Sequence, residues 1–330
     1  MNRGRPWIFL ATGTAFFAAS FAVVKKLVEL GEVEFPDSHN PISFCNVLFV
    51  GNLIAGVAFA LFFQKDRRPQ TFRSIRPVNW GQLLVIAFLE GALAPTLIFV
   101  ALSEIPVASV VLIQSIKIPL ILLLAWWLQR ETTSAPAALG AGLGVAGIAL
   151  MMILKPTSEA TAGGLWGVSE GKVALASVFF VLATQLRRMM GTTIPLGIYF
   201  LARTVAGGIF FAIIVLNAFG PSHFMDVFDP FLWKWMLIYG LVIVAVGQIA
   251  WQLALRSVGA AEISASEAAT PVLGILFAYL LLGQAPTQAE ILGGVVVVGG
   301  MMLSLWGTVR SSPTSTPPAA LPKPGPFTGI

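Results

Sequence analysis

The stretch PVASVVLIQSIKIPLILLLAWWLQRE, residues 106–131, is a long apolar segment with a single lysine, Lys117, near its centre. A related stretch, ISASEAATPVLGILFAYLLLGQ, occupies residues 263–284. The residues around the two stretches recur at a separation of 153 positions, with one slip to 152 between Pro119 and Pro271: Ala101/Ala254, Glu131/Gln284, Gly140/Gly293 and Gly147/Gly300. A repeat of this length predicts that the chain consists of two related halves.

The composition of the chain predicts a membrane protein. Its 330 residues are 57% hydrophobic and only 11% charged, whereas soluble domains contain about 25% charged residues. The single cysteine, Cys45, excludes an intramolecular disulfide framework. The net charge of +5 could suggest a nucleic-acid partner, but the basic residues are distributed by membrane side, so membrane topology explains them and we expect no nucleic acid. The expected partners are the lipid bilayer and a small-molecule substrate. The sequence leaves open whether the protein is a monomer or a homodimer.

Ten continuously apolar segments approach the roughly 20 residues that a helix needs to cross the bilayer. They cover residues 7–24, 42–63, 80–101, 106–128, 135–154, 171–188, 196–218, 232–255, 262–283 and 287–309. Because the segments do not alternate in polarity, we predict helices and not a membrane β-barrel. The first segment resembles a secretory signal, but Lys25 and Lys26 follow it where a cleavage site would need small residues, so we expect it to be retained.

The loop charges predict the orientation of the helices. With the N-terminus inside, 13 basic residues lie on the cytoplasmic side and 5 on the opposite side. Both termini are therefore expected in the cytoplasm. Because each half has five helices, an odd number, the second half enters the membrane inverted relative to the first. The predicted fold is an all-α integral membrane protein with a first five-helix repeat at 1–154, an outside linker at 155–171, a second repeat at 172–309 and a Pro- and Ser-rich disordered tail at 310–330.

The repeated pattern resembles the EamA-type domain of the drug/metabolite transporter superfamily. Pro119 is followed by Glu131 and the glycines at 140 and 147, Pro271 by Gly283-Gln284 and the glycines at 293 and 300, and SFAVVKK at 20–26 resembles the opening of the family's first helix. The sequence departs from the family pattern at Gln284, where Glu is usual. The resemblance implies a ten-helix carrier that works by alternating access, has no nucleotide-hydrolysing domain and exports amino acids or related metabolites.

Four ionisable residues lie well inside the predicted helices: Glu90, Lys117, Arg203 and Glu267. A charged side chain costs about 2.5–3.5 kcal/mol at the centre of a membrane helix, so such residues face a water-filled cavity or a partner and are candidates for the substrate site. Glu90 and Lys117 lie about ten residues from the starts of their helices. At 1.5 Å per residue, both are roughly 15 Å deep, near the membrane midplane.

Lys117 is the first candidate for substrate binding. Gln114 lies one turn earlier on the same helix face, so an ammonium and an amide point together into the bundle and can bind a carboxylate or a phosphate. A structural ion pair between Lys117 and Glu90 is the alternative. Glu90 in turn is a counter-ion to Lys117, a receiver for a substrate ammonium or a proton carrier, and the sequence does not decide between these roles.

Further polar residues form stripes that line the same cavity or hold helices together by hydrogen bonds. Gln248 and Gln252 are one turn apart beside Trp251, and Ser264, Glu267 and Thr270 step by three along the ninth helix. We give less weight to Thr184, Tyr199 and Arg203, and expect a structural or snorkelling role for Arg203. Arg187 and Arg188 are expected as anchors at the membrane interface, and the glycines of the fifth and tenth helices as sites of close packing.

These features predict a secondary transporter of the inner (plasma) membrane that exports small polar metabolites, such as amino acids or related organic anions, through a midplane site. The sequence contains no phosphate-binding loop, no HExxH motif and no Cys/His pair, so we expect neither an enzyme nor a metal or cofactor site. A carrier of larger anions, such as nucleotide sugars or sugar phosphates, is the first alternative. A membrane-embedded enzyme or a scaffold that does not transport is the second.

Overall fold

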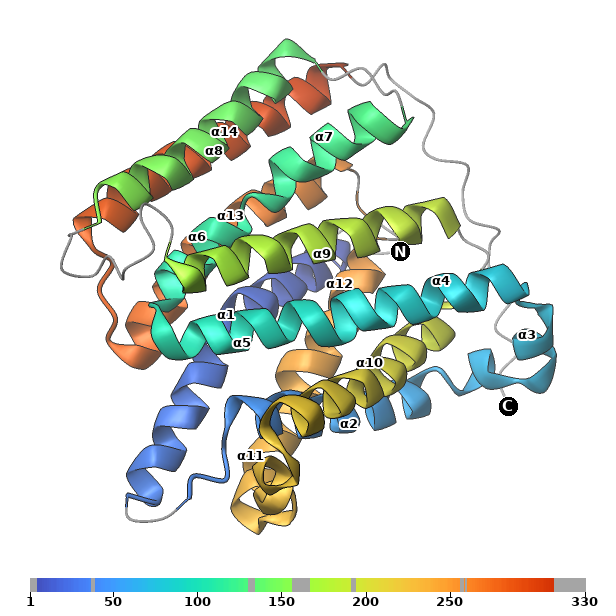
Figure 1. The fold of residues 1–330 in the computed structure, drawn as a ribbon. Coiled ribbons are helices and arrows are strands. Elements are labelled where there is room, and N and C mark those ends of the chain that lie inside the picture. The colour runs from blue at the N-terminus through green and yellow to red at the C-terminus, as the bar shows by residue number, and fades with distance from the viewer. Residues whose placement is uncertain are drawn as a thin grey trace.

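Ten helical spans are long and apolar enough to cross a membrane, as the sequence predicts. A computed structural model describes residues 5–36, 39–129, 134–155, 167–190, 194–255, 258 and 260–311, and no strand occurs in these ranges. Most of the predicted linker and the tail beyond residue 311 lie outside them. The spans are formed by α1 (Arg5–Glu34), α2 (Phe44–Phe62), α4 and α5 (Pro77–Phe88, Ala94–Glu104), α6 and α7 (Val107–Gln114, Lys117–Gln129), α8 (Ala135–Ile153), α9 (Val168–Met190), α10 (Leu196–Phe219), α11 and α12 (Pro230–Ile238, Gly247–Leu255), α13 (Ala260–Leu282) and α14 (Gln288–Ser311) (Figure 1).

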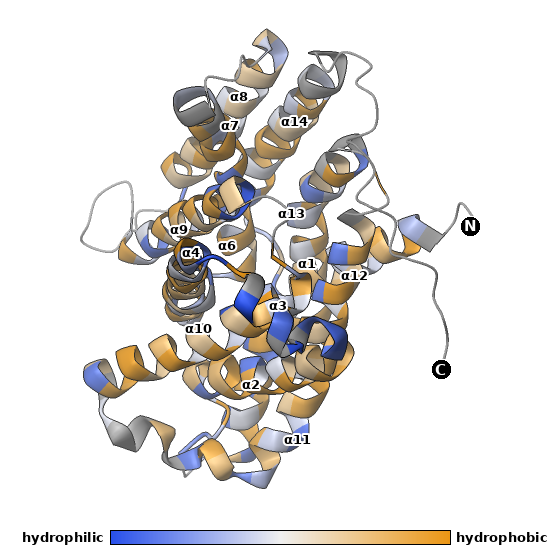
Figure 2. Cartoon of the chain, turned by 90° about the vertical axis from the view of Figure 1, so that its right-hand side faces the viewer, coloured by the Kyte–Doolittle hydropathy of each residue, from blue (hydrophilic) through white to orange (hydrophobic). Residues whose placement is uncertain are grey.

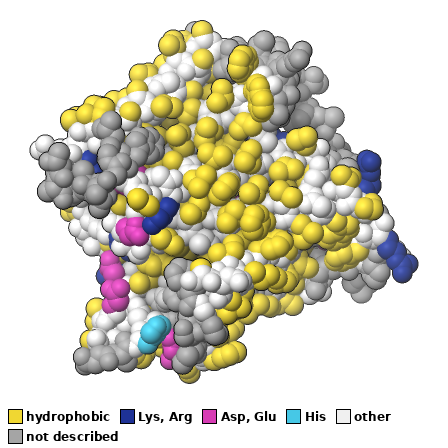
Figure 3. Space-filling view, in the orientation of Figure 1, with side chains coloured by type: hydrophobic (Ala, Val, Ile, Leu, Met, Phe, Trp, Pro, Cys, Tyr) yellow, Lys and Arg dark blue, Asp and Glu magenta, His cyan; other side chains and the backbone are white. Residues whose placement is uncertain are grey.

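The surface is apolar along the helices and charged at their ends. In Figure 3, hydrophobic side chains cover the middle of the visible face, basic side chains stand at its right-hand edge, and acidic side chains lie at its left and lower left, where further basic side chains accompany them. Figure 2 shows the end of the molecule where the short helix α3 (Pro69–Ser74) lies, and the hydrophilic residues concentrate there. The apolar band fits a bilayer, and the ends fit the water on its two sides.

Two spans contain a π-helical turn where their two helices join. In the third span, η2 (Leu89–Leu93) joins α4 to α5, and the Ala94 N–H bonds to the carbonyl of Leu89. Pro95 follows directly and has no N–H for the carbonyl of Gly91, which favours this wider turn. In the eighth span, η4 (Tyr239–Val246) joins α11 to α12 without a proline. The third and eighth spans occupy equivalent places in the two predicted halves.

Glycines bring α8 and α14 into close contact (Figure 1). A Cβ atom on Gly147 would lie 2.7 Å from the carbonyl oxygen of Gly293, and a Cβ on Gly293 would lie 2.7 Å from that of Gly147. The same reciprocal approach joins Gly140 and Gly300. These contacts bear out the close packing that the sequence predicts for the fifth and tenth helices. Gly144, in contrast, has nothing within 4 Å of its Cβ position.

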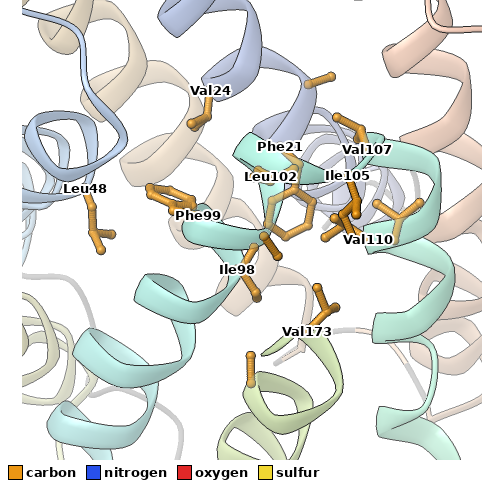
Figure 4. Packing of buried hydrophobic residues seen from close by; sticks show 14 of the residues in the cluster. Phe21, Val24, Leu48, Ile98, Phe99, Leu102, Ile105, Val107, Val110 and Val173 are labelled. Carbon is orange, nitrogen blue, oxygen red and sulfur yellow. The ribbon is translucent and has the colours of Figure 1, made fainter. Parts of the chain in front are cut away.

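Apolar side chains fill the end of the bundle where α5 turns into α6. Figure 4 shows Phe21 of α1 among Ile98 and Leu102 of α5, Val110 of α6 and Val173 of α9. Ile98, Leu102, Val110 and Val173 are at most 1% exposed. Several spans are therefore densely packed around one aromatic ring at this end of the molecule.

Polar contacts tie the start of α6 to the start of α14 at this same end. The hydroxyl of Ser109 donates to Glu290 Oε1 at 2.6 Å, although Glu290 is only 3% exposed. Glu290 also accepts from the backbone N–H of Thr287 at 2.9 Å, and its own N–H donates to the Thr287 hydroxyl at 3.2 Å. This reciprocal pair is a capping box, so Glu290 both begins α14 and holds α6 against it.

Candidate functional site

The fourth span breaks immediately before Lys117. The backbone N–H groups of Ile116 and Ile118 bond to the carbonyls of Ile113 and Ser115, three residues back, instead of the four typical of an α-helix. Pro119 explains the break, since it lacks an N–H and its ring crowds the carbonyl of Ser115. Pro271, its counterpart in the repeat, lies inside the continuous helix α13. The proline is repeated in both halves of the sequence, but it interrupts the helix in the first half only.

Lys117 is the first residue of α7 and is held by Gln114, the last residue of α6. Its Nζ donates to Gln114 Oε1 at 2.9 Å. Gln114 is only 4% exposed, and its Nε2 atom has no hydrogen-bond partner. An unsatisfied buried amide costs about 1–3 kcal/mol. The break thus presents an ammonium beside a buried amide whose N–H donors are unused, which is a ready site for an anionic oxygen.

Two aromatic rings from other spans flank the ammonium of Lys117. Its Nζ lies 5.3 Å from the ring centre of Phe17 in α1 and 5.6 Å from that of Phe180 in α9. Both distances suit a cation–π contact. The sequence gives no signal for these two phenylalanines, because phenylalanine is frequent in the apolar spans of this chain, and only the tertiary structure brings them to Lys117.

Glu90 forms its ion pair with Arg203, not with Lys117. Glu90 Oε1 accepts from Arg203 Nη1 at 2.9 Å, and Glu90 Oε2 accepts from the Tyr199 hydroxyl at 2.9 Å. The side chains of Arg203 and Glu90 are 14% and 18% exposed. This contact joins the π-helical turn η2 to α10 and occupies both carboxylate oxygens. It gives Arg203 the structural role that the sequence favours.

Arg187 extends the polar network toward α12. Its guanidinium carbon lies 4.0 Å from the ring centre of Tyr199, and its Nη2 donates to Gln252 Oε1 at 3.1 Å. The prediction of an interfacial anchor is therefore wrong for Arg187, because the side chain turns inward onto an aromatic ring and an amide. Its neighbour Arg188 is exposed.

Glu267 belongs to the surroundings of Lys117. It lies on α13, is exposed, and is within electrostatic range of both Lys117 and Arg188. Lys117 is also within electrostatic range of Glu90. The charged residues that the sequence predicts inside the helices are therefore near one another. Their direct partners differ from the prediction, since Glu90 pairs with Arg203 and not with Lys117.

The remaining candidates lie on the surrounding helices. Gln248 and Trp251 are half-buried on α12, and Ser264 is on α13, with a side chain outside the described part of the structure. The Thr184 hydroxyl donates to the carbonyl of Phe180 at 2.8 Å, and that of Thr270 donates to the carbonyl of Ser266 at 3.1 Å. These two hydroxyls bond to their own helices and offer less to a ligand than Gln114 does.

Comparison with known proteins agrees with this architecture. A model of the EamA-like transporter family matches residues 5–153 and 170–306. A protein of Synechocystis sp. described as an uncharacterized transporter is 36% identical over 308 residues, which cover 92% of this chain and 88% of the relative. An uncharacterized transporter of Methanothermobacter thermautotrophicus is 22% identical over 321 residues, covering 93% and 88%. A crystal structure with 19% identity shares the fold, with a TM-score of 0.55 over 90% of this chain and 99% of the other.

Proposed function

The chain belongs to the EamA-like transporter family of the drug/metabolite transporter superfamily, and on this premise we propose that it is a secondary transporter that exports small polar metabolites across the inner membrane. The observation that carries this proposal is the break at Lys117. It sets a cation beside an unpartnered buried amide about 15 Å along a membrane span at 1.5 Å per residue, a depth that supports a site near the bilayer midplane. Both relatives are described as transporters, which points to transport and not to enzymatic catalysis.

The proposed topology is two inverted five-helix repeats with both termini in the cytoplasm. The glycine contacts between α8 and α14 support it. Gly140 and Gly147 of the first half correspond in sequence to Gly293 and Gly300 of the second, yet Gly140 meets Gly300 and Gly147 meets Gly293. Such an exchange of partners is what a two-fold axis between the halves produces. The basic residues in and beside α3 support the cytoplasmic orientation of the end that carries it: Lys65, Arg67, Arg68, Arg73 and Arg76.

The proposed mechanism is alternating access around Lys117. The halves meet at one end of the fourth and ninth spans, where a Cβ on Gly274 of α13 would lie 2.9 Å from Val111 of α6, and where the Val107 N–H donates to Gln284 Oε1 at 3.3 Å. Beyond the break, α7 packs instead on α8 and α9. Substrate bound at the break is then released to one side or the other as the halves rock about it.

Transport into proteoliposomes tests this function. Purified protein is reconstituted and supplied with a panel of amino acids, organic acids and phosphorylated metabolites, with and without a pH gradient. We expect at least one compound to move without ATP, and Lys117→Ala to abolish its transport. Lys26→Ala is the matched control, because Lys26 is 52% exposed near the end of α1 and pairs only with Glu29 among the described ion pairs. A panel on which nothing moves, or a fully active Lys117→Ala protein, would refute the proposal.

A further inference from the structure

We infer that the substrate bound at Lys117 is a net anion, a carboxylate carried on an apolar body, and not a zwitterion. This inference rests on the proposed transport function and narrows it. Three features of the described residues lead to it: the charge balance around Lys117, the hydrogen-bonding groups left open there, and the aromatic rings beside the ammonium.

The charges connected to Lys117 carry an excess of positive sign. Three cations and two carboxylates from five spans form this group: Lys117, Arg187, Arg203, Glu90 and Glu267. One positive charge is therefore uncompensated within the group, and the exposed Arg188 in the last turn of α9 adds to the positive side. Charges inside membrane spans are costly unless they are paired or hydrated. A substrate with net negative charge reduces this imbalance, whereas a zwitterion leaves it unchanged.

The open hydrogen-bonding groups beside Lys117 are donors. Gln114 Oε1 already accepts from the lysine, so what remains are N–H groups of the ammonium and of the unpartnered Gln114 Nε2. Neighbouring charged and amide donors match the two oxygens of a carboxylate. The pair of Lys117 and Gln114 therefore recognises an acceptor and has no free side-chain acceptor of its own.

A substrate ammonium would find Glu90 already occupied. Both oxygens of Glu90 are engaged, one by Arg203 and one by Tyr199. Glu267, the other carboxylate, has no hydrogen bond or ion pair among the described contacts, but it lies within electrostatic range of Lys117 and Arg188. An α-amino acid would have to compete with these two cations for Glu267, which disfavours it relative to an anion of the same shape.

The rings of Phe17 and Phe180 favour an apolar body on the carboxylate. Both lie within 6 Å of the lysine ammonium, so a carboxylate on Nζ brings its adjacent carbon atoms against these rings. Burying an apolar group there is favourable at about 25 cal/mol per Å². A small, strongly hydrated anion would lose its bound water on entering the site and would bury no apolar group in return.

Matched ligands test the inference. L-3-Phenyllactate and L-phenylalanine share one carbon skeleton and differ in a hydroxyl against an ammonium, while succinate is an anion without an apolar body. Binding to the purified protein is measured by isothermal titration, and transport by counterflow in proteoliposomes. We expect phenyllactate to bind and move roughly tenfold or more better than either of the others.

The Gln114→Glu variant tests the donor geometry. It keeps the size of the side chain but places a carboxylate against Lys117, so phenyllactate affinity should fall roughly tenfold or more, while Lys26→Ala should leave it unchanged. Phe180→Ala should weaken phenyllactate more than Phe180→Leu does. If a variant fails to fold, as judged by size-exclusion chromatography, the wild-type ligand comparison still decides the inference.

The possible outcomes separate the inference from the transport function. Phenylalanine moving as well as phenyllactate, or succinate moving in its place, overturns the inference and leaves transport standing. Phenyllactate that binds, with neither it nor any compound of the wider panel moving, overturns transport and upholds the ligand class. If none of the three binds, the inference is wrong, and the wider panel then decides the transport function separately.

Discussion

Gly140 in α8 and Gly300 in α14 touch backbone to backbone: a Cβ on Gly140 would lie 2.4 Å from the Gly300 carbonyl oxygen, and a Cβ on Gly300 would lie 2.6 Å from that of Gly140. No side-chain rotation relieves such a contact. The spacing of the two helices therefore depends on the absence of a methyl group at these positions.

Gly140→Ala should destabilise the protein by about 1–3 kcal/mol, because the methyl group forces α8 and α14 apart. Gly142→Ala is the matched control on the same helix, since nothing lies within 4 Å of its Cβ position. That substitution should be neutral or raise stability by about 0.5 kcal/mol, because alanine favours the helix over glycine. Thermal unfolding of the two variants in detergent checks the opposite signs. Equal shifts would mean that α8 and α14 do not pack through Gly140.

Glu90→Gln should destabilise the protein by about 3 kcal/mol, because it leaves the Arg203 guanidinium, which is only 14% exposed, without its counter-ion. The double variant Glu90→Gln/Arg203→Met should recover part of that loss, since neither charge then remains. A double-mutant cycle measured by thermal unfolding gives the coupling between the two side chains. Strictly additive losses would show that the ion pair contributes nothing.

Tyr199→Phe should cost about 1–2 kcal/mol, because it removes the hydroxyl that donates to Glu90 and keeps the ring under Arg187. Tyr199→Leu should cost about 1 kcal/mol more, since the guanidinium then loses its aromatic face. Comparing the unfolding of the two variants separates the hydrogen bond from the cation–π contact. If the two substitutions cost the same, Arg187 gains nothing from the ring.

Pro119→Ala should slow transport strongly, because it restores the backbone N–H and lets α6 and α7 join into one straight helix. Lys117 and Gln114 would then leave their present geometry. Pro271→Ala serves as the control, since α13 is continuous already and should change little. Proteoliposome transport rates of the two variants test the difference. Comparable rates in both would show that the break has no part in the transport cycle.

Labelling with a membrane-impermeant maleimide tests the proposed orientation. The single native cysteine is removed as Cys45→Ser, and cysteines are introduced one at a time as Lys26→Cys and Gln64→Cys, both at exposed positions at opposite ends of the spans. With the termini in the cytoplasm, only Lys26→Cys should react from outside intact cells. Labelling of Gln64→Cys instead would reverse the topology.

Most of the fold follows from the sequence, because apolar length and loop charge are local properties that each segment carries by itself. The sequence therefore predicts all ten spans and the glycines through which α8 and α14 pack. It does not predict which side chains of the site contact one another. Depth along a helix placed Glu90 and Lys117 at one level, but Glu90 meets Arg203 and Tyr199 because η2 lies against α10, and helix neighbours are not encoded in depth.

Two further features escaped prediction for similar reasons. Arg187 lies three residues from the end of α9, which is typical of an interfacial anchor, and only the position of the Tyr199 ring turns it inward. Pro119 and Pro271 look equivalent in the repeat, yet their helices respond differently. A proline shows where a helix is able to break, and the packing around it decides whether it does.

The one-sided break bears on the energetics of the transport cycle. If both halves bent alike, exchanging their shapes would convert one end state into the other, and the two states would have the same free energy. With α6 and α7 separated at Ser115 and α13 intact, that exchange does not reproduce the molecule. In the proposed alternating-access cycle we therefore expect the empty carrier to populate its two states unequally. Its preferred resting side would then be a property of the chain itself, set before any substrate or ion gradient acts on it.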